Sequence, residues 1–282
     1  MPFKQALLGD NFYDRDGRLT TAFYDGISLE AKSKILMTVS GNHDLWVYGK
    51  PQYGEELDQY GHGFMQWYAQ DTVASVESPN GFLDFSVPVD DRKDSKKFRD
   101  RNSGRNFVWY TKIGSVGFIG FNGAAPTDDE SRYFAEACEY FKGNVQSAFV
   151  LGHWDNSYER DIAIGTPDVR KKISRLSGCS ELGHDLRYMD GHKHLNYIQE
   201  KSYHGHPVGF KIGGHGMENG KAGTEVFGFL YVKSYGKGGQ NDEVWYFEEI
   251  NKKYGKDNYQ EILDCVNRGR VDDCTHLAER WL

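Results

Sequence analysis

Residues 35–44 read Ile-Leu-Met-Thr-Val-Ser-Gly-Asn-His-Asp and join a strand-like run to a polar turn. Its first half is a short run of apolar and β-branched residues, which predicts a buried strand. Gly41 then allows a sharp turn, and the polar residues 42–44 follow it directly. A rigid strand that ends this way can aim polar side chains at one point, as layered α/β proteins do at a sheet edge.

The same alternation of short strands and polar, helix-compatible stretches runs along the chain and predicts an α/β layered fold. The expected strands are bounded by Gly, Asn or Asp: Phe3–Leu8, Ile35–Ser40, Phe82–Val87, Phe107–Thr111, Val116–Phe121, Ser147–Leu151, Val208–Ile212, Val226–Lys233 and Val244–Ile250. The expected helices are Glu55–Thr72, Asp128–Phe141, Asp168–Leu176 and much of Asn258–Leu282. In the second helix the first turn is acidic and apolar residues recur at helical spacing, which predicts a core-facing stripe.

The composition excludes several classes of protein. The 282 residues carry 34 Lys and Arg against 41 Asp and Glu, a formal net charge of −7. This acidic balance, with a pI near 5.8, lacks the basic footprint of a nucleic-acid-binding protein, so no nucleic-acid partner is expected. The longest apolar runs are far shorter than the roughly 20 residues of a bilayer span, so no membrane span is expected. A mixed-charge run at Asp90–Lys97 predicts a solvated loop or, alternatively, a phosphate-attracting rim.

The four cysteines leave the redox state open. Cys265 and Cys274 lie close together in the sequence and can form a disulfide or remain buried free thiols. Cys138 and Cys179 each stand alone in the sequence. None of the four forms a Cys-x-x-Cys pair, so neither a zinc ribbon nor a thioredoxin-like redox site is supported.

Four short motifs occur in order, each after a predicted strand. They are Gly-Asp-Asn-Phe-Tyr at 9–13, Gly-Asn-His-Asp at 41–44, Gly-His at 152–153 and Gly-His-Lys-His at 191–194, the last after Arg187–Asp190. Any one of them is a weak signal, because Gly-Asp and Gly-His pairs are common in turns and on surfaces. Four in order, each at a strand end, predict one site built from distant parts of the chain.

The residue types in these motifs indicate metal chemistry. Carboxylate and amide oxygens together with imidazoles suit Zn, Fe or Mn rather than Ca. In an extended Gly-His-x-His segment, His192 and His194 project to the same side and can serve two adjacent ions. Asp10 can bridge two cations through its two oxygens. Two ions about 3.5–4 Å apart can hold a hydroxide and clamp an oxyanion, the arrangement for in-line phosphoryl hydrolysis.

On these motifs the sequence resembles the calcineurin-like metallophosphoesterase family, and Gly-Asp-Asn-Phe-Tyr resembles the version in its purple (tartrate-resistant) acid phosphatase subgroup. The resemblance runs from about Phe3 to Val232, and residues 211–216 are similar to the glycine-rich segment that follows the family's last motif. It implies a two-sheet β-sandwich flanked by helices, in four αββα layers. The chain would then hold a metallophosphoesterase domain over 1–250 and a C-terminal helical extension over 251–282.

The resemblance also implies a role for each motif residue. The implied metal ligands are Asp10, Tyr13, Asn42, His153, His192 and His194. Asp10 would bridge two ions, Tyr13 (as a phenolate) and His194 would bind the first, and the other three would complete the second site. The implied cofactor is a pair of metal ions, iron with iron, zinc or manganese. His43 would be the general acid.

The expected function is therefore a dinuclear metal-dependent phosphatase that hydrolyses phosphomonoesters. A metal-bound hydroxide would attack phosphorus while His43 donates a proton to the leaving oxygen. Small phosphate esters or a phosphoprotein are the expected substrates, because an acidic chain mildly repels polyanions. The alternatives are a phosphodiesterase of the same family and a catalytically weak or inactive metal-binding module. The oligomeric state is left open.

One departure from the family pattern concerns the N-terminus. The family's first motif, an Asp on the strand before Gly-Asp, has no counterpart, because only eight residues precede Gly9. The first metal would lack a terminal carboxylate, and neighbouring strands would lack a hydrogen-bonding partner. We therefore expect an N-terminally incomplete form of a longer protein. Residues 1–5 contain no signal segment, and an extracytoplasmic, lysosomal or vacuolar location is compatible with a missing N-terminal portion.

Overall fold

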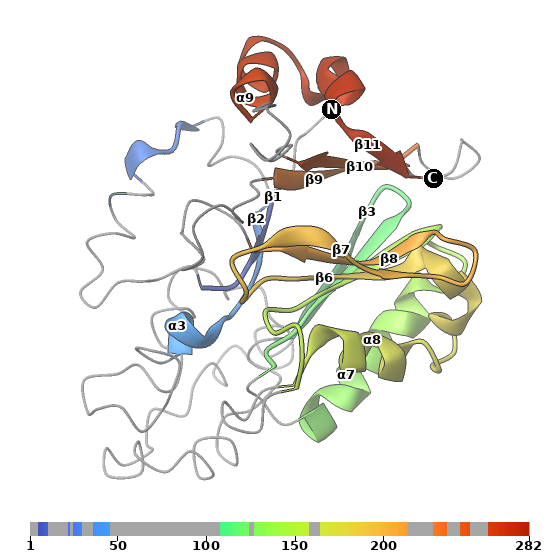
Figure 1. The fold of residues 1–282 in the computed structure, drawn as a ribbon. Helices are drawn as coiled ribbons and strands as arrows, with labels where there is room; N and C mark the ends of the chain where they lie inside the picture. Colours follow the sequence, from blue (N-terminus) through green and yellow to red (C-terminus); the bar gives the residue numbers. More distant parts are fainter. Residues whose placement is uncertain are drawn as a thin grey trace, which may run out of the picture.

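A six-stranded mixed sheet forms the centre of the molecule (Figure 1). This computed structural model describes residues 5–10, 22, 25–29, 36–45, 108–123, 127–157, 164–213, 228–235, 243–248 and 259–281. The strands lie in the order β3-β4-β5-β6-β8-β7, with bounds Trp109–Ile113, Val116–Gly120, Ser147–Leu151, Leu186–Asp190, Pro207–Ile212 and Asn196–Lys201. The four inner strands run parallel, and the edge strands β3 and β7 are antiparallel to their neighbours.

Most residues of the inner strands are apolar because both faces of the sheet are covered. Every residue of β4, β5 and β6 is buried, as expected where parallel strands lie between two layers. Phe118 of β4 pairs in register with Phe149 of β5, and their rings stack at 6.0 Å between centroids. The sheet is therefore a rigid support for the loops at its strand ends.

Two helices cover one face of this sheet. They are α7 (Thr127–Phe141) and α8 (Thr166–Ile173), and the 3₁₀ segment η5 (Ser180–Asp185) lies on the same face. The cluster beneath them includes Phe134, Ile119 and Val150. Cys138 of α7 forms a disulfide with Cys179, with 5.0 Å between their Cα atoms. This pair joins α7 to the start of η5 across 41 residues of sequence.

A second layer of strands covers the opposite face. It contains the parallel pair β1 (Gln5–Leu8) and β2 (Leu36–Val39) and a three-stranded antiparallel sheet in the order β11-β10-β9. The bounds of the latter are Glu279–Trp281, Glu243–Glu248 and Gly228–Lys233. Met37, Val39 and Val244 pack against Phe149 and Phe210 of the central sheet in one cluster. The two strand layers thus share a hydrophobic core.

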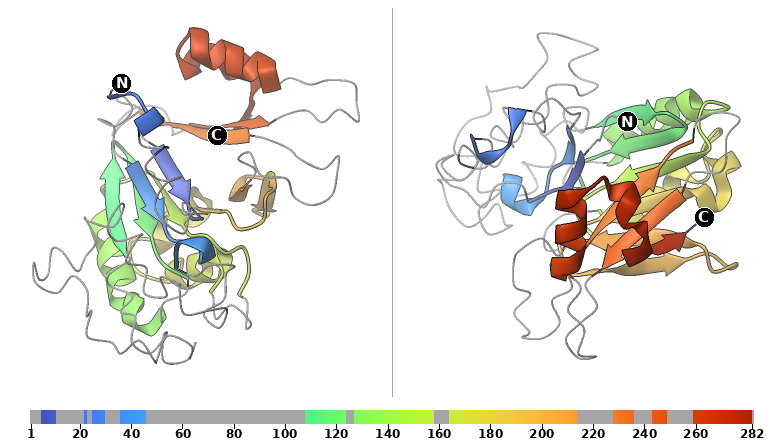
Figure 2. Two further views of the ribbon diagram at one scale, coloured as in Figure 1. Left: turned by 90° about the vertical axis from the view of Figure 1, so that its left-hand side faces the viewer. Right: turned by 90° about the horizontal axis from the view of Figure 1, so that it is seen from above.

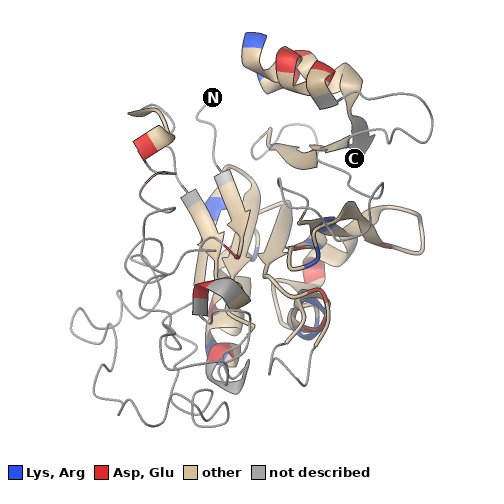
Figure 3. Cartoon of the chain, turned by 60° about the vertical axis from the view of Figure 1, so that its left-hand side comes forward, with Lys and Arg blue, Asp and Glu red and all other residues tan. Residues whose placement is uncertain are grey.

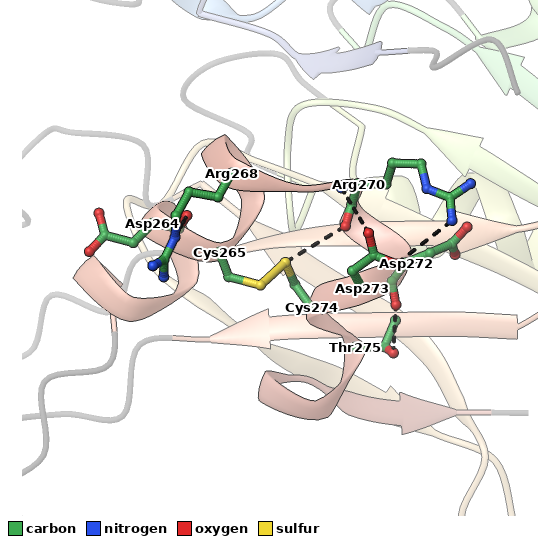
Figure 4. The surroundings of a disulfide bond; sticks show 8 residues. All are labelled: Asp264, Cys265, Arg268, Arg270, Asp272, Asp273, Cys274 and Thr275. Atoms are coloured by element: carbon green, nitrogen blue, oxygen red, sulfur yellow. Dashed lines mark hydrogen bonds and ion pairs between the residues drawn. A yellow bond between two sulfur atoms is a disulfide. The ribbon is translucent and has the colours of Figure 1, made fainter.

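A C-terminal cap, which we define as β9, β10, β11, helix α9 (Tyr259–Arg268) and the 3₁₀ segment η7 (Val271–Leu277), completes the fold. Figure 2 shows α9 on the side of this small sheet away from the central sheet. Phe247, Ile262 and Cys274 form its buried cluster, and α9 carries both acidic and basic residues (Figure 3). A disulfide joins Cys265 of α9 to Cys274 of η7 (Figure 4).

The expected α/β fold of sheets with flanking helices is confirmed. Strand β5 and helix α7 fall within one residue of their predicted bounds, whereas β7 and β11 were not expected. The prediction of helix through much of Asn258–Leu282 agrees with α9 and η7, whereas residues 279–281 form a strand because they pair with β10. The division into domains 1–250 and 251–282 stays a prediction. The predicted strand 82–87, helix 55–72 and charged run 90–97 lie outside the described residues.

The cysteine chemistry is settled in favour of disulfides. All four cysteines are paired, including Cys138 and Cys179, which stand alone in the sequence. Sequence separation gave no indication of this pair, because its two members meet only when α7 packs beside η5.

The helices of the described part of the chain are short. None of them combines the length and the apolar character needed to cross a membrane.

Candidate metal centre

Four of the predicted metal ligands come together at the ends of four strands. His153 Nε2 lies 3.0 Å from Asn42 Oδ1 and 3.3 Å from a carboxylate oxygen of Asp10. His192 Nδ1 lies 3.0 Å from the same Asn42 oxygen and 3.2 Å from His153 Nε2. These residues follow β1, β2, β5 and β6 and are separated by up to 182 positions, counted from Asp10 to His192.

Glycines let the strand ends approach so closely. Gly9 has a φ of 86°, and a Cβ on it would lie 2.5 Å from His153 Nδ1. A Cβ on Gly41 would collide with the backbone nitrogen and carboxylate of Asp10. Asp44 fixes the second turn, since its carboxylate accepts a hydrogen bond from the Gly41 N–H at 2.7 Å. Asp44 therefore has a structural role in the Gly-Asn-His-Asp motif.

Two of the ligands have left-handed backbone conformations. Asp10 has a φ of 53° and His192 a φ of 60°. For a residue with a Cβ this region costs roughly 1–2 kcal/mol, and it persists where the surroundings determine the conformation. The segment at 191–194 is therefore a tight turn, closed by Lys193 N–H donating to the Gly191 carbonyl at 2.7 Å. The expectation of an extended Gly-His-x-His segment is wrong, because the turn follows β6 instead of continuing it.

The hydrogen bonding of His153 determines which nitrogen faces the centre. His153 Nδ1 lies 2.7 Å from the Leu8 carbonyl, which can only accept, so Nδ1 carries the hydrogen. In the neutral ring, Nε2 then presents its lone pair toward Asn42 and Asp10. A carbonyl that orients an imidazole in this way is typical of metal-binding histidines.

The charges around the two imidazoles shift their pKa values in opposite directions. Burial opposes protonation of His153, but the carboxylate of Asp10 and the Leu8 carbonyl outweigh it and raise the pKa of His153. Burial, together with the positive charge of a protonated His153, lowers the pKa of His192 to about 4. The two neighbouring imidazoles therefore differ in basicity, His153 being the stronger base and His192 the weaker one.

The donor set fits a metal ion. The facing atoms are one carboxylate oxygen, one amide oxygen and two imidazole nitrogens, and the ligand atoms of Asp10, His153 and His192 all lie within 4.8 Å of one another. Lone pairs at such distances repel unless a proton or a cation lies between them. This mixture of oxygen and imidazole ligands suits Zn, Fe or Mn.

Three further predicted site residues are His194, His43 and Tyr13. His194 is half-buried, two residues after His192 in the same turn. His43 lies in helix α3 (Asn42–Leu45), and its side chain is outside the described part. Tyr13 also lies outside the described residues.

A buried charge cluster next to the centre was not predicted as a unit. We call it the Lys211 cluster: the Lys211 ammonium contacts the Asp190 carboxylate and lies 3.4 Å from Asp155, which also accepts Lys193 at 2.6 Å. The side chains of Lys211 and Asp190 are fully buried. Burial raises the pKa of Asp190 to about 7 against the opposing effect of Lys211. No sequence signal identified Lys211, because a lysine in a strand usually faces solvent.

Together, the fold and the centre define a mixed α/β protein with a polar, metal-compatible group at converging strand ends. Among solved structures the chain is similar to a purple acid phosphatase, PPD1, isolated from yellow lupin (Lupinus luteus) seeds, with 14% identity and a TM-score of 0.42. This similarity covers 90% of the chain but 45% of that protein, so the chain spans less than half of its length. No family model matches the chain, and no curated protein matches it. The assignment of function therefore depends on the geometry of the centre.

Proposed function

We propose that this protein is a metal-dependent phosphatase that hydrolyses phosphomonoesters. The observation that supports this most strongly is the convergence of Asp10, Asn42, His153 and His192 at four strand ends. The closely packed glycines Gly9 and Gly41 and the left-handed backbones of Asp10 and His192 hold these polar groups at one point, at a cost in folding energy.

The proposed roles divide the motif residues between binding and proton transfer. One metal ion would be held by Asp10, Asn42, His153 and His192. A second would be held by Asp10, Tyr13 and His194. The proposed pair of ions is iron with iron, zinc or manganese. When bound, the ions supply an activated water and neutralise charge on the phosphoryl oxygens. His43 donates a proton to the leaving oxygen, and its position in α3, directly after Asn42, supports this role.

The two disulfides support an oxidising compartment. Disulfides persist in secreted, periplasmic and vesicular environments and are rare where thiols are kept reduced. Both pairs lie within packed clusters, one beside α7 and one in the C-terminal cap. We therefore include an extracytoplasmic, lysosomal or vacuolar location in the proposal.

The test is hydrolysis of two model esters by the purified protein. Protein loaded with Fe, Zn or Mn should hydrolyse p-nitrophenyl phosphate, and faster than bis(p-nitrophenyl) phosphate. A chelator should abolish the activity, and replacing the metal should restore it. Tight metal binding without hydrolysis would contradict the enzyme and support a metal-binding module. Faster cleavage of the diester would contradict the assignment to monoesters.

The role of His43 has its own test. His43→Ala should lower turnover by roughly 10²–10⁴-fold, while the metal content stays near that of the unmodified protein. The matched change His206→Ala alters a histidine in the turn between β7 and β8 and should leave turnover unchanged. Unchanged turnover in His43→Ala, or loss of its metal, would show that His43 is not the proton donor.

A further inference from the structure

The Lys211 cluster is built from residues adjacent to two of the proposed metal ligands. Asp155 follows His153 by two positions, and Asp190 precedes His192 by two positions. Lys211 lies on β8 beside β6, where Asp190 and Lys211 are direct register partners. Its ammonium therefore reaches both ligand-bearing segments from a third strand.

Hydrogen bonds continue this connection through the backbone. Lys211 Nζ donates to the Gly191 carbonyl at 3.2 Å. The Gly191 N–H donates in turn to the His153 carbonyl at 2.9 Å. One residue, Gly191, thus joins Lys211 to both the His153 segment and the His192 turn.

The backbone at His192 needs such a support. Its left-handed conformation is disfavoured for a residue with a Cβ. A residue persists in this region only where neighbouring contacts determine its conformation. The contact of Lys211 with Asp190 and Gly191 fixes the two residues that immediately precede His192.

Charge explains why this position needs a lysine. Two carboxylates, Asp155 and Asp190, are buried side by side, and burying an uncompensated charge is strongly unfavourable. Lys193 compensates Asp155 from the surface, since its side chain is 45% exposed. The Gln199 amide, turned so that its nitrogen faces Asp190, donates to both carboxylate oxygens at 3.2 and 3.1 Å. Lys211 supplies the positive charge that lies between the two carboxylates.

We propose that Lys211 is a positioning residue, which fixes Gly191 and thereby holds the imidazoles of His153 and His192 in the geometry that binds metal. It acts through these two residues without touching the metal or the substrate. The proposal rests on the proposed function only in taking the centre as a metal site, and it requires no hydrolysis.

The first measurement follows the loop itself in metal-free protein. Lys211→Met keeps the aliphatic chain and removes the ammonium, whereas Lys112→Met changes an exposed lysine on β3 and serves as the control. Amide hydrogen exchange at Gly191 and Lys193 should be about tenfold faster or more in Lys211→Met, because a charge-assisted hydrogen bond is lost. Exchange in the β3–β4 hairpin should be unchanged. Equal exchange at Gly191 and Lys193 in both variants would overturn the proposal.

A second variant distinguishes a positioning role of Lys211 from a role in charge balance alone. It also provides a test if Lys211→Met fails to fold. Lys211→Met combined with Asp190→Asn removes the unpaired carboxylate and should recover the melting temperature lost in the single variant. Exchange at Gly191 should nevertheless stay fast, and Mn²⁺ should bind about 10–100-fold more weakly than to the unmodified protein. Normal exchange and normal Mn²⁺ affinity in the double variant would overturn the proposal. If the unmodified protein binds no Mn²⁺, the proposed function fails, while the exchange result still decides the role of Lys211.

Discussion

The candidate metal centre and the C-terminal cap are stabilised in different ways. The centre joins residues from four strand ends that are far apart in sequence, and it depends on polar contacts and left-handed backbone at Asp10 and His192. The cap is formed by consecutive elements, packs around Phe247 and Ile262, and is closed by a disulfide between residues nine positions apart. Left-handed backbone is therefore found where distant strand ends bring polar side chains together, whereas the cap is held by apolar packing and a covalent link.

The largest expected effect on metal binding is at the candidate metal centre. His192→Ala removes one of four facing donors, so the affinity for Zn²⁺ or Mn²⁺ should fall by more than about 100-fold, since loss of a group that merely orients a ligand costs about 10–100-fold. Titration calorimetry of the metal-free protein measures this directly. His206→Ala is the matched control and should keep full affinity. Equal affinities in the two variants would remove His192 from the centre.

The largest expected effect on stability concerns the disulfide between Cys138 and Cys179. Replacing Cys138 and Cys179 by alanine should lower the free energy of unfolding by about 3.9 kcal/mol, because this bond closes a loop of 41 residues in the unfolded chain. Guanidinium denaturation of the oxidised protein and the double variant gives the difference. A loss below that of the cap disulfide would contradict the loop-length argument.

Removal of the cap disulfide should have a smaller effect. Cys265→Ala with Cys274→Ala should cost about 2.6 kcal/mol, since the closed loop spans nine positions. The affinity for Mn²⁺ should stay unchanged, because the cap contributes none of the four facing donors. Weaker metal binding in this variant would show that the cap and the centre are coupled.

The smallest effect is a polar contact in the cap. Tyr231 donates to Asp272 at 3.0 Å, and Tyr231→Phe should cost about 1 kcal/mol of unfolding free energy at neutral pH. Burial of Asp272 opposes its ionisation, but hydrogen bonds from Lys233 and Tyr231 outweigh it and hold the pKa of Asp272 below its ordinary value of 3.8.

The pH dependence of this contact follows from the sign of that shift. Because the folded pKa of Asp272 is the lower one, its contribution to stability is complete above pH 3.8 and is lost as the pH falls through the folded pKa. The difference between Tyr231→Phe and the unmodified protein should therefore shrink at the lowest pH at which both still fold. A difference that grows with acidity would contradict the assignment.

The sequence predicted those strands and helices whose own residues show a clear apolar pattern. Strand β5 is a continuous apolar run and α7 has an acidic first turn and a helical stripe, so both were found within one residue. Strand β7 was missed because it is a polar edge strand, Asn-Tyr-Ile-Gln-Glu-Lys, whose pairing with β8 is set by the tertiary fold. The three-residue β11 depends in the same way on β10.

In the candidate site, too, the residues in local motifs were predicted and those that depend on tertiary packing were not. The motifs predicted that Asp10, Asn42, His153 and His192 would meet, because each follows a strand and strand ends converge at a sheet edge. Their assignment as metal ligands stays a prediction. The Lys211 cluster could not be predicted, since the burial of a lysine depends on neighbours contributed by three different segments.

The most direct test of the proposed metal site is X-ray absorption spectroscopy of the protein loaded with one equivalent of Zn²⁺. We expect a tightly bound ion with two imidazole nitrogens and two oxygens, and one imidazole fewer in His153→Ala. An ion bound without histidine, or no tightly bound ion at all, would contradict the proposal that these four strand ends form a metal centre.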